Sequence, residues 1–236
     1  MTDAVLVVNA GSSSIKFSLF AARGNELDLV VRGQAEGLYA HPRFVVKDRT
    51  GGVVSERSWD DGTNLGHGGA LEHLTGFLRG EMSDYRLAGV GHRVVHGGAA
   101  FTEPVLVDRD VVAALGRLTP LAPLHQPHNL TPIQLLLERR PELPQVACFD
   151  TAFHHRNPPV AQMFALPEEL TREGVRRYGF HGLSYEYVAS VLPQHDPKAA
   201  AGRTVVLHLG NGSSMCALEG VRAWRARWGS RRSKAS

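Results

Sequence analysis

A hairpin pattern occupies residues 4–20, which read AVLVVNAGSSSIKFSLF. An apolar run from Ala4 to Asn9 is interrupted by small residues, and residues 15–20 then alternate apolar and polar side chains, so the pattern predicts strand, turn and strand. Backbone N–H groups in this turn could cradle a phosphate, and Lys16 would add positive charge. The turn lacks the second glycine of a P-loop, and an ordinary serine-rich hairpin is the alternative.

Strand and helix patterns alternate along the rest of the chain. This alternation predicts an α/β protein with a mixed sheet. We expect lobes at residues 1–152 and 153–218, followed by a basic tail at 219–236. The predicted strands are 27–37, 43–47, 87–95, 145–149 and 204–209, and the predicted helices are 70–78, 111–118, 133–138 (opened by Thr131-Pro132), 167–173 and 184–192.

Composition and charge exclude several classes of protein. The chain has 236 residues, 43% of them hydrophobic and 21% charged, which is enough apolar material for a buried core. Six of the 26 basic side chains lie in residues 221–236, so residues 1–220 hold 20 basic and 23 acidic side chains. We therefore expect no nucleic-acid partner. With no apolar run that would span a bilayer and no signal peptide, we expect no membrane partner and a cytoplasmic location. Cys148 and Cys216 lie in apolar runs and are interpreted as buried thiols.

A second glycine-rich turn, Gly210-Asn211-Gly212, follows the predicted strand 204–209. An Asn-Gly pair alone is typical of a hairpin turn. Two such turns, each after a hydrophobic strand, suit a nucleotide held between two lobes.

Two strand ends carry candidate binding residues. Alternation along strand 87–95 sends Arg93 and Val95 to one face and His92 and His96 to the other, and an HxxxH spacing on a strand does not favour a zinc site. Arg93 is suited to a bidentate grip on a carboxylate, with a structural salt bridge as the alternative. Asp150 ends strand 145–149, where α/β sheets bind ligands, although it could simply cap a helix.

Six motifs in order resemble the acetate kinase (acetokinase) family: VVNAGSSSIKFSLF, GHRVVHGG, PLAPLHQPHNL, ACFDTAFH, RRYGFHGLSYEYV and VVLHLGNGSSMCAL. The resemblance runs from about residue 4 to residue 218. It implies the acetate and sugar kinase, actin-like fold, in two lobes of which the second is incomplete. It also implies reversible phosphoryl transfer from ATP to acetate with Mg²⁺ or Mn²⁺, in a cytoplasmic homodimer that serves acetyl-CoA biosynthesis.

The same resemblance implies roles for individual residues. Catalysis is assigned to Asp150 and His181, and the metal site to Asn9. The substrate would be bound by Arg93, Val95, Leu124 and Phe180, the nucleotide by Lys16, His208, Leu209, Gly210, Asn211 and Gly212, and phosphate by Ser12 and Ser14. Acetate is already an anion near neutrality, since carboxylic acids titrate around ~4. We therefore expect Asp150 to hold a magnesium-bound water, where the family description has it donate or accept a proton.

After Leu218 the motifs stop, and we expect the resemblance to end there. Family members continue through a third nucleotide loop, another catalytic arginine and a late glutamate, none of which has a matching position here. One hypothesis is a shifted reading frame or another truncation after this point, which the alternative frames of the coding DNA would test. The alternatives to acetate kinase activity are a catalytically incompetent chain, a binding module that uses the basic tail, and a kinase for propionate or butyrate.

Overall fold

The computed structural model describes residues 1–210 and 212–229, which form two compact units. The first unit holds Met1–Val94 and Pro104–Cys148, and the second holds Val95–Glu103 and the described residues from Phe149 onward. The chain thus crosses between units three times, whereas we expected a single boundary between the two lobes, after residue 152. The segment 95–103 joins the second unit because Phe101 stacks on Phe149 with ring centroids 5.5 Å apart.

The first unit is built on one sheet in the order β5-β4-β3-β2-β1-β6-β8-β7. Strands β1 to β5 are antiparallel neighbours, and β1 is parallel to β6. The strands are β1 (Thr2–Ala10), β2 (Ser14–Arg23), β3 (Glu26–Glu36), β4 (Arg43–Asp48), β5 (Val53–Ser58), β6 (Tyr85–Val94), β7 (Val105–Leu106) and β8 (Gln145–Phe149). The predicted hairpin is confirmed, whereas β5 was missed because its side chains are mostly exposed and its pattern is weak.

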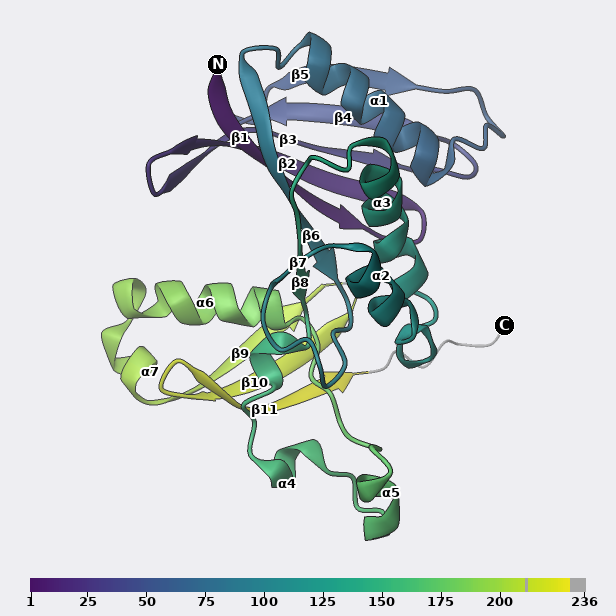
Figure 1. Cartoon of the computed structure of the whole chain (residues 1–236). Coiled ribbons are helices and arrows are strands. Elements are labelled where there is room, and N and C mark those ends of the chain that lie inside the picture. Colours follow the sequence, from purple (N-terminus) through teal and green to yellow (C-terminus); the bar gives the residue numbers. More distant parts are fainter. Residues whose placement is uncertain (211, 230–236) are drawn as a thin grey trace. The chain divides into compact units, whose positions relative to one another are not determined.

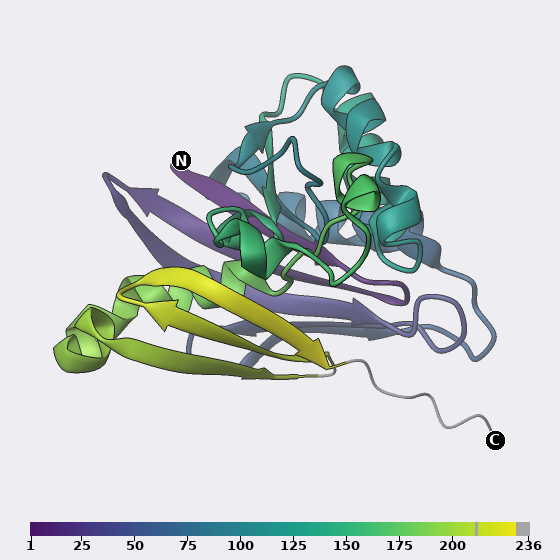
Figure 2. The same cartoon turned by 90° about the horizontal axis from the view of Figure 1, so that it is seen from below.

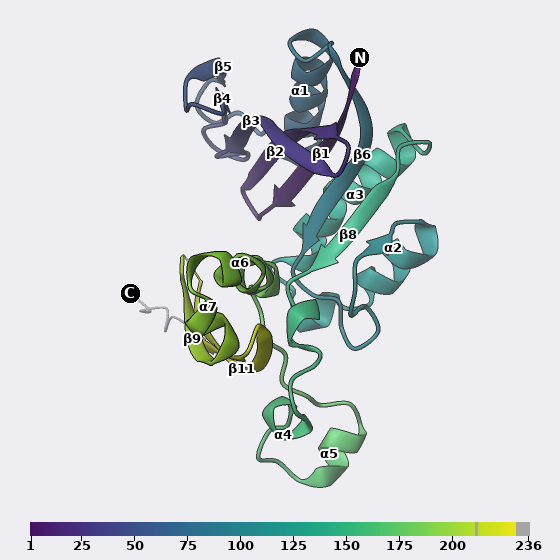
Figure 3. The same ribbon diagram turned by 90° about the vertical axis from the view of Figure 1, so that its left-hand side faces the viewer.

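Helices α1 (Gly66–Gly80) and α3 (Gln126–Arg139) cover one face of this sheet (Figures 1 and 3). The unit also contains α2 (Arg109–Gly116) and the 3₁₀ turn η1 (Thr119–Leu121). The core joins alternate residues of β1 and β2 to the apolar stripe of α1, which is the arrangement the period-2 and period-3.6 patterns predict. Its members from these elements are Ala4, Leu6, Val8, Ala10, Ile15, Phe17, Leu19, Ala70, Leu71, Leu74 and Phe77.

Helix α3 begins earlier than the sequence predicts. We expected Thr131-Pro132 to open it, but the helix starts at Gln126 and Pro132 lies inside. Pro127 already occupies the first turn, where a missing N–H is harmless. Thr131 Oγ1 donates to the carbonyl of Pro127 at 2.9 Å, four residues back, as hydroxyl side chains do inside helices.

The second unit has a three-stranded antiparallel sheet in the order β11-β10-β9, drawn in olive to yellow in Figure 2. Tyr185 and Ala189 of α6 pack with Cys216 and Leu218 of β10 and Ala223 of β11. The opposite face exposes the aliphatic side chains of β9. The elements are η2 (Ala152–His154), α4 (Pro159–Gln162), α5 (Glu168–Arg172), α6 (Gly182–His195), α7 (Pro197–Ala201), β9 (Arg203–Leu209), β10 (Ser213–Glu219) and β11 (Arg222–Gly229).

Strand β11 lies in residues 219–236, where we expected a basic tail, and it extends the second sheet beyond Leu218. β10 is paired on both sides, with β9 and with β11. Ala223 and Ala226 face the core between exposed arginines, and these small residues gave too weak an apolar signal to predict a strand. The side chains of Val205, Leu207 and Leu209 of β9 are 62%, 55% and 77% exposed.

The two cysteines differ in burial. Cys216 is fully buried, and burial raises the pKa of its thiol to about 12, so it is an inert core residue. Cys148, also expected to be buried, is only half-buried, and in the described part of the chain neither cysteine forms a disulfide. None of the helices in the described part of the chain has the length and apolar character that a membrane span requires.

Buried His92 makes stability depend on pH. Its side chain is 2% exposed and its Nε2–H donates to Oε1 of Gln145 at 2.8 Å. Burial lowers the pKa of His92 from 6.5 to about 4. Below the ordinary histidine pKa the unfolded chain binds a proton that the folded chain does not bind until about pH 4.

We predict that the free energy of unfolding falls by about 3 kcal/mol as the pH falls from about 6.5 to about 4, through His92 alone. The variant His92→Gln should lose this part of the pH dependence, whereas the control His195→Gln, at an exposed site, should keep it. Urea unfolding followed by circular dichroism at several pH values measures the slope. Equal slopes for wild type and His92→Gln would contradict the prediction.

Candidate active site

In the first unit, two helices hold the backbone of the β1–β2 turn. Asn129 of α3 donates from Nδ2 to the carbonyl of Ala10 at 2.6 Å, and His67 of α1 donates from Nε2 to the carbonyl of Gly11 at 2.7 Å. Burial lowers the pKa of His67, so the ring is neutral at pH 7 and its Nδ1 accepts from the Tyr39 hydroxyl. The carbonyls of Ala10 and Gly11 therefore each accept a hydrogen bond from a helix side chain.

The amides of the same turn are turned to solvent. In residues 1–210 and 212–229, no group accepts from the backbone N–H of Ser12 or Ser13, and both residues are exposed. Ser14 is half-buried, and its carbonyl accepts from Gly11 N–H at 2.7 Å. Exposed amides on a fixed backbone are the feature that a phosphate-binding turn needs.

Three predicted residues of the first unit meet on one face of its sheet. Asn9 of β1 is the direct cross-strand partner of Lys16 of β2. Arg93, near the end of β6, donates from Nη1 to Oδ1 of Asn9 at 3.1 Å. Lys16 also lines a groove of about 510 Å³ together with the basic side chains Arg32 and Lys47. This face therefore concentrates positive charge beside the serine turn.

In the second unit, the candidate catalytic pair is joined through the backbone. Asp150, which is 1% exposed, accepts a hydrogen bond at its carbonyl from Gly182 N–H at 2.8 Å. A Cβ at Gly182 would lie 2.2 Å from that carbonyl oxygen, so only glycine allows the approach. His181 precedes Gly182 and has φ of 58°, a left-handed conformation that costs a residue with a Cβ roughly 1–2 kcal/mol. Such strain clusters at functional sites.

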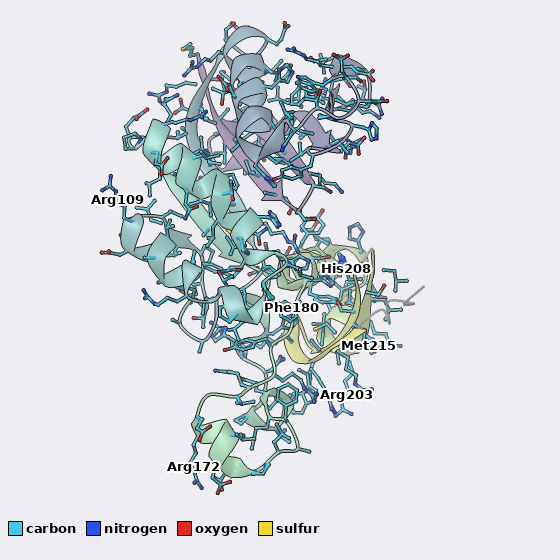
Figure 4. All side chains as sticks on the ribbon, turned by 90° about the vertical axis from the view of Figure 1, so that its right-hand side faces the viewer. Arg109, Arg172, Phe180, Arg203, His208 and Met215 are labelled. Carbon is cyan, nitrogen blue, oxygen red and sulfur yellow. The ribbon has the colours of Figure 1, made fainter. Side chains whose placement is uncertain are left out.

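The His181 ring is fixed by its neighbours. It stacks on the ring of His208 from β9, with centroids 4.2 Å apart and planes inclined by 24°. His181 Nδ1 lies 2.7 Å from Oγ of Ser214. Figure 4 labels His208 on this sheet together with Phe180, the residue before His181. Ser214 and buried Tyr185 were not predicted, because the hydroxyl of a serine in a Ser-Ser pair and a tyrosine on an apolar helix face carry no special sequence signal.

Two further buried histidines, His96 and His154, contact Phe180. His96 accepts at Nδ1 from Gly98 N–H at 2.8 Å, and its ring lies edge-on to Phe180 at 5.7 Å. His154 donates from Nε2 to the carbonyl of Phe180 at 3.1 Å. Burial lowers the pKa of both rings, that of His96 to about 4, so both are neutral near pH 7. Their contacts are those of neutral hydrogen-bonding residues.

The predicted site residues are divided between the two units. Leu124, in the first unit, is 75% exposed and lies in the loop before α3, whereas Val95, in the second unit, is 8% exposed. Asn211 lies outside the described residues. The first unit holds Asn9, Ser12, Ser14, Lys16, Arg93 and Leu124, and the second holds Val95, Asp150, Phe180, His181, His208, Leu209, Gly210 and Gly212.

Comparison with known proteins identifies the family. The sequence model of the Acetokinase family matches residues 4–229. The chain belongs to the Acetokinase family. The acetate kinase of Nitrobacter hamburgensis is 50% identical over 222 residues, covering 94% of this chain and 55% of that protein. The acetate kinase of Rhodopseudomonas palustris is 51% identical over 221 residues, covering 92% and 55%. This acetokinase chain thus spans about half the length of the curated relatives it matches.

Solved acetokinase structures confirm the expected fold class, the α/β fold of the acetate and sugar kinase, actin-like superfamily. A propionate kinase from Francisella tularensis has a TM-score of 0.84 at 33% identity, covering 96% of this chain and 57% of that one. An acetate kinase from Porphyromonas gingivalis has a TM-score of 0.80 at 32% identity, with 96% and 57% covered. The family match also extends to residue 229, beyond the expected end of the resemblance at Leu218.

We predict that Gly182→Ala lowers the free energy of unfolding by about 2 kcal/mol or more, because its Cβ would collide with the Asp150 carbonyl. Gly76→Ala in α1 is the matched control, since the space around its Cβ is open, and it should leave stability unchanged or raise it by about 0.5–1 kcal/mol. Urea unfolding measures both. Equal stabilities of the two variants would contradict the close approach.

Proposed function

We propose that this acetokinase chain carries the residues for reversible transfer of the γ-phosphoryl group of ATP to acetate, giving acetyl phosphate and ADP. The observation that carries the proposal is the joined pair of buried Asp150 and strained His181 in the second unit. Curated relatives about 50% identical bear the name acetate kinase. A homodimer stays a prediction from the family resemblance. A cytoplasmic location and the absence of nucleic-acid and membrane partners stay predictions, the latter two from the charge balance and the hydropathy of the sequence.

Arg93 is proposed to bind the acetate carboxylate through its planar guanidinium, which matches a carboxylate bidentately. Its contact with Asn9 Oδ1 holds the side chain on the sheet face. Val95 and Phe180, with Leu124, are proposed to contact the methyl group. The exposed amides of Ser12 and Ser13, the Ser14 hydroxyl and Lys16 supply donors for phosphate oxygens on the first unit. His208, Leu209, Gly210, Asn211 and Gly212 are proposed to supply them on the second.

The residues present fit a magnesium ion bound mainly through phosphates and water. Among the described residues, no three His, Cys, Asp or Glu side chains form a metal-binding group. Mg²⁺ does not need one, since it is held by one or two carboxylates, substrate phosphates and waters. When bound, it would neutralise charge on the phosphate oxygens. Asp150 is proposed to orient one of the waters on the magnesium ion. Oδ1 of Asn9 already accepts from Arg93, and a contact between Asn9 and the metal stays a prediction.

His181 is proposed to donate a hydrogen bond to the phosphoryl group during transfer. The acceptor oxygen of acetate is already ionised, so no residue has to remove a proton from it. Transfer then requires positioning of the two substrates and stabilisation of charge on the equatorial oxygens. Arg93, Lys16 and His181 are the cationic or N–H-bearing groups proposed for these tasks.

We predict that Asp150→Asn lowers kcat about 10- to 100-fold at low Mg²⁺ and recovers activity at high Mg²⁺, because the lost carboxylate orients a metal-bound water. ATP formation from acetyl phosphate and ADP measures this. Glu186→Gln, an exposed change on α6, is the control and should match wild type. A loss that is insensitive to Mg²⁺ but depends on pH would favour proton transfer by Asp150. An inactive wild-type chain would support the catalytically incompetent alternative.

A second candidate substrate is propionate, which the similarity to the Francisella tularensis propionate kinase favours. Val95 is 8% exposed, so truncating it opens space beside the candidate methyl pocket. We predict that Val95→Ala shifts the ratio of kcat/KM values toward propionate by about tenfold, since one methylene in an apolar pocket is worth about 1–3 kcal/mol. An unchanged ratio would remove Val95 from the pocket. A wild-type preference for propionate would make propionate the substrate.

A further inference from the structure

Tyr185 has one acceptor for its hydroxyl proton. The side chain is 0% exposed and its Oη lies 2.5 Å from Oγ of Ser214. Among the residues that the structure describes, Ser214 Oγ is the one hydrogen-bond partner of the Tyr185 hydroxyl. A buried donor without an acceptor is costly, so Tyr185 donates to Ser214.

The direction of the next hydrogen bond follows from this one. A serine hydroxyl has a single proton, and the oxygen of Ser214 already accepts from Tyr185. Ser214 is 6% exposed, and Nδ1 of His181, 2.7 Å away, is its other side-chain hydrogen-bond partner among the described residues, so the buried Ser214 proton points at that nitrogen. A ring nitrogen that accepts carries no proton, so the neutral imidazole of His181 carries its proton on Nε2.

We propose that Ser214 and Tyr185 are positioning residues that fix His181 in the Nε2–H tautomer. The stack on His208 fixes the plane of the ring, while the hydroxyl chain decides which nitrogen bears the proton. The left-handed backbone conformation of His181 fixes the direction in which its side chain leaves the backbone. A donor held in this way needs no reorganisation when charge develops on a phosphoryl oxygen.

The value of this tautomer for catalysis rests on the proposed kinase function, but the tautomer itself is measured without any activity. The experiment is a long-range ¹H–¹⁵N correlation spectrum of the 236-residue chain with labelled histidine. It is recorded at pH 8, above the ordinary imidazole pKa of ~6.5. The nitrogen shifts of His181 should show a bare Nδ1 and a protonated Nε2. The opposite pattern in the wild type would overturn the proposal.

Three variants test the hydrogen bonds that run from Tyr185 through Ser214 to His181. Ser214→Ala should populate the Nδ1–H form of His181, and Ser214→Thr, which keeps the hydroxyl, should restore the Nε2–H form. Tyr185→Phe should give a mixture, because the Ser214 oxygen then lacks its other donor and accepting from Nδ1–H becomes more favourable. The control Ser190→Ala removes an exposed hydroxyl from the same helix and should match wild type. A pure Nε2–H form in Ser214→Ala would overturn the role of Ser214, and in Tyr185→Phe that of Tyr185.

Kinetics separate positioning from simple structural support. Ser214→Ala should lower kcat about tenfold with less than about a twofold change in KM for acetate, and Ser214→Thr should recover kcat. Equal losses in Ser214→Ala and Ser214→Thr, with the tautomer unchanged in both, would show a purely structural role. An inactive wild type with the expected tautomer would refute the proposed function and leave the tautomer assignment standing.

Discussion

The approach of the α6 backbone to the end of β8 is the constraint on which the candidate site depends. Gly182 N–H reaches the carbonyl of Asp150 at 2.8 Å, and a side chain at position 182 would occupy the same space. Because His181 is the residue before Gly182, this contact fixes the backbone of buried Asp150 next to that of His181, which is left-handed. Ser214 then forms its hydrogen bond with the ring of a residue whose backbone position is already fixed.

In the first unit, hydrogen bonds to the backbone fix the β1–β2 turn. To bind phosphate, this serine-rich turn must keep its backbone N–H groups exposed. Its carbonyl groups still need hydrogen-bond donors, because unpaired backbone groups are unfavourable. Asn129 and His67 bind the carbonyls of Ala10 and Gly11 from two helices, so the turn is fixed without using its N–H groups. In the first unit, side chains hold the backbone beside residues that are proposed to bind phosphate, and in the second unit a backbone hydrogen bond holds the two candidate catalytic residues.

Local patterns were sufficient to predict much of this fold. The alternation in residues 4–20 and the helical spacing of Leu71, Leu74 and Phe77 report directly on which face is buried. The start of α3 was mispredicted because Thr131-Pro132 imitates a helix opening. Strand β11 was missed because its core contacts are made by alanines. Ser214 and Tyr185 are 29 residues apart, and only the packing of α6 on β10 brings their oxygens together.

The most direct test of this account is a trans-hydrogen-bond NMR coupling between the amide nitrogen of Gly182 and the carbonyl carbon of Asp150, measured with the backbone coupling that reports φ of His181. The account predicts a resolved coupling and a positive φ at His181. No coupling together with a negative φ would show that Gly182 and Asp150 do not meet in this way. The candidate catalytic pair would then have no common anchor.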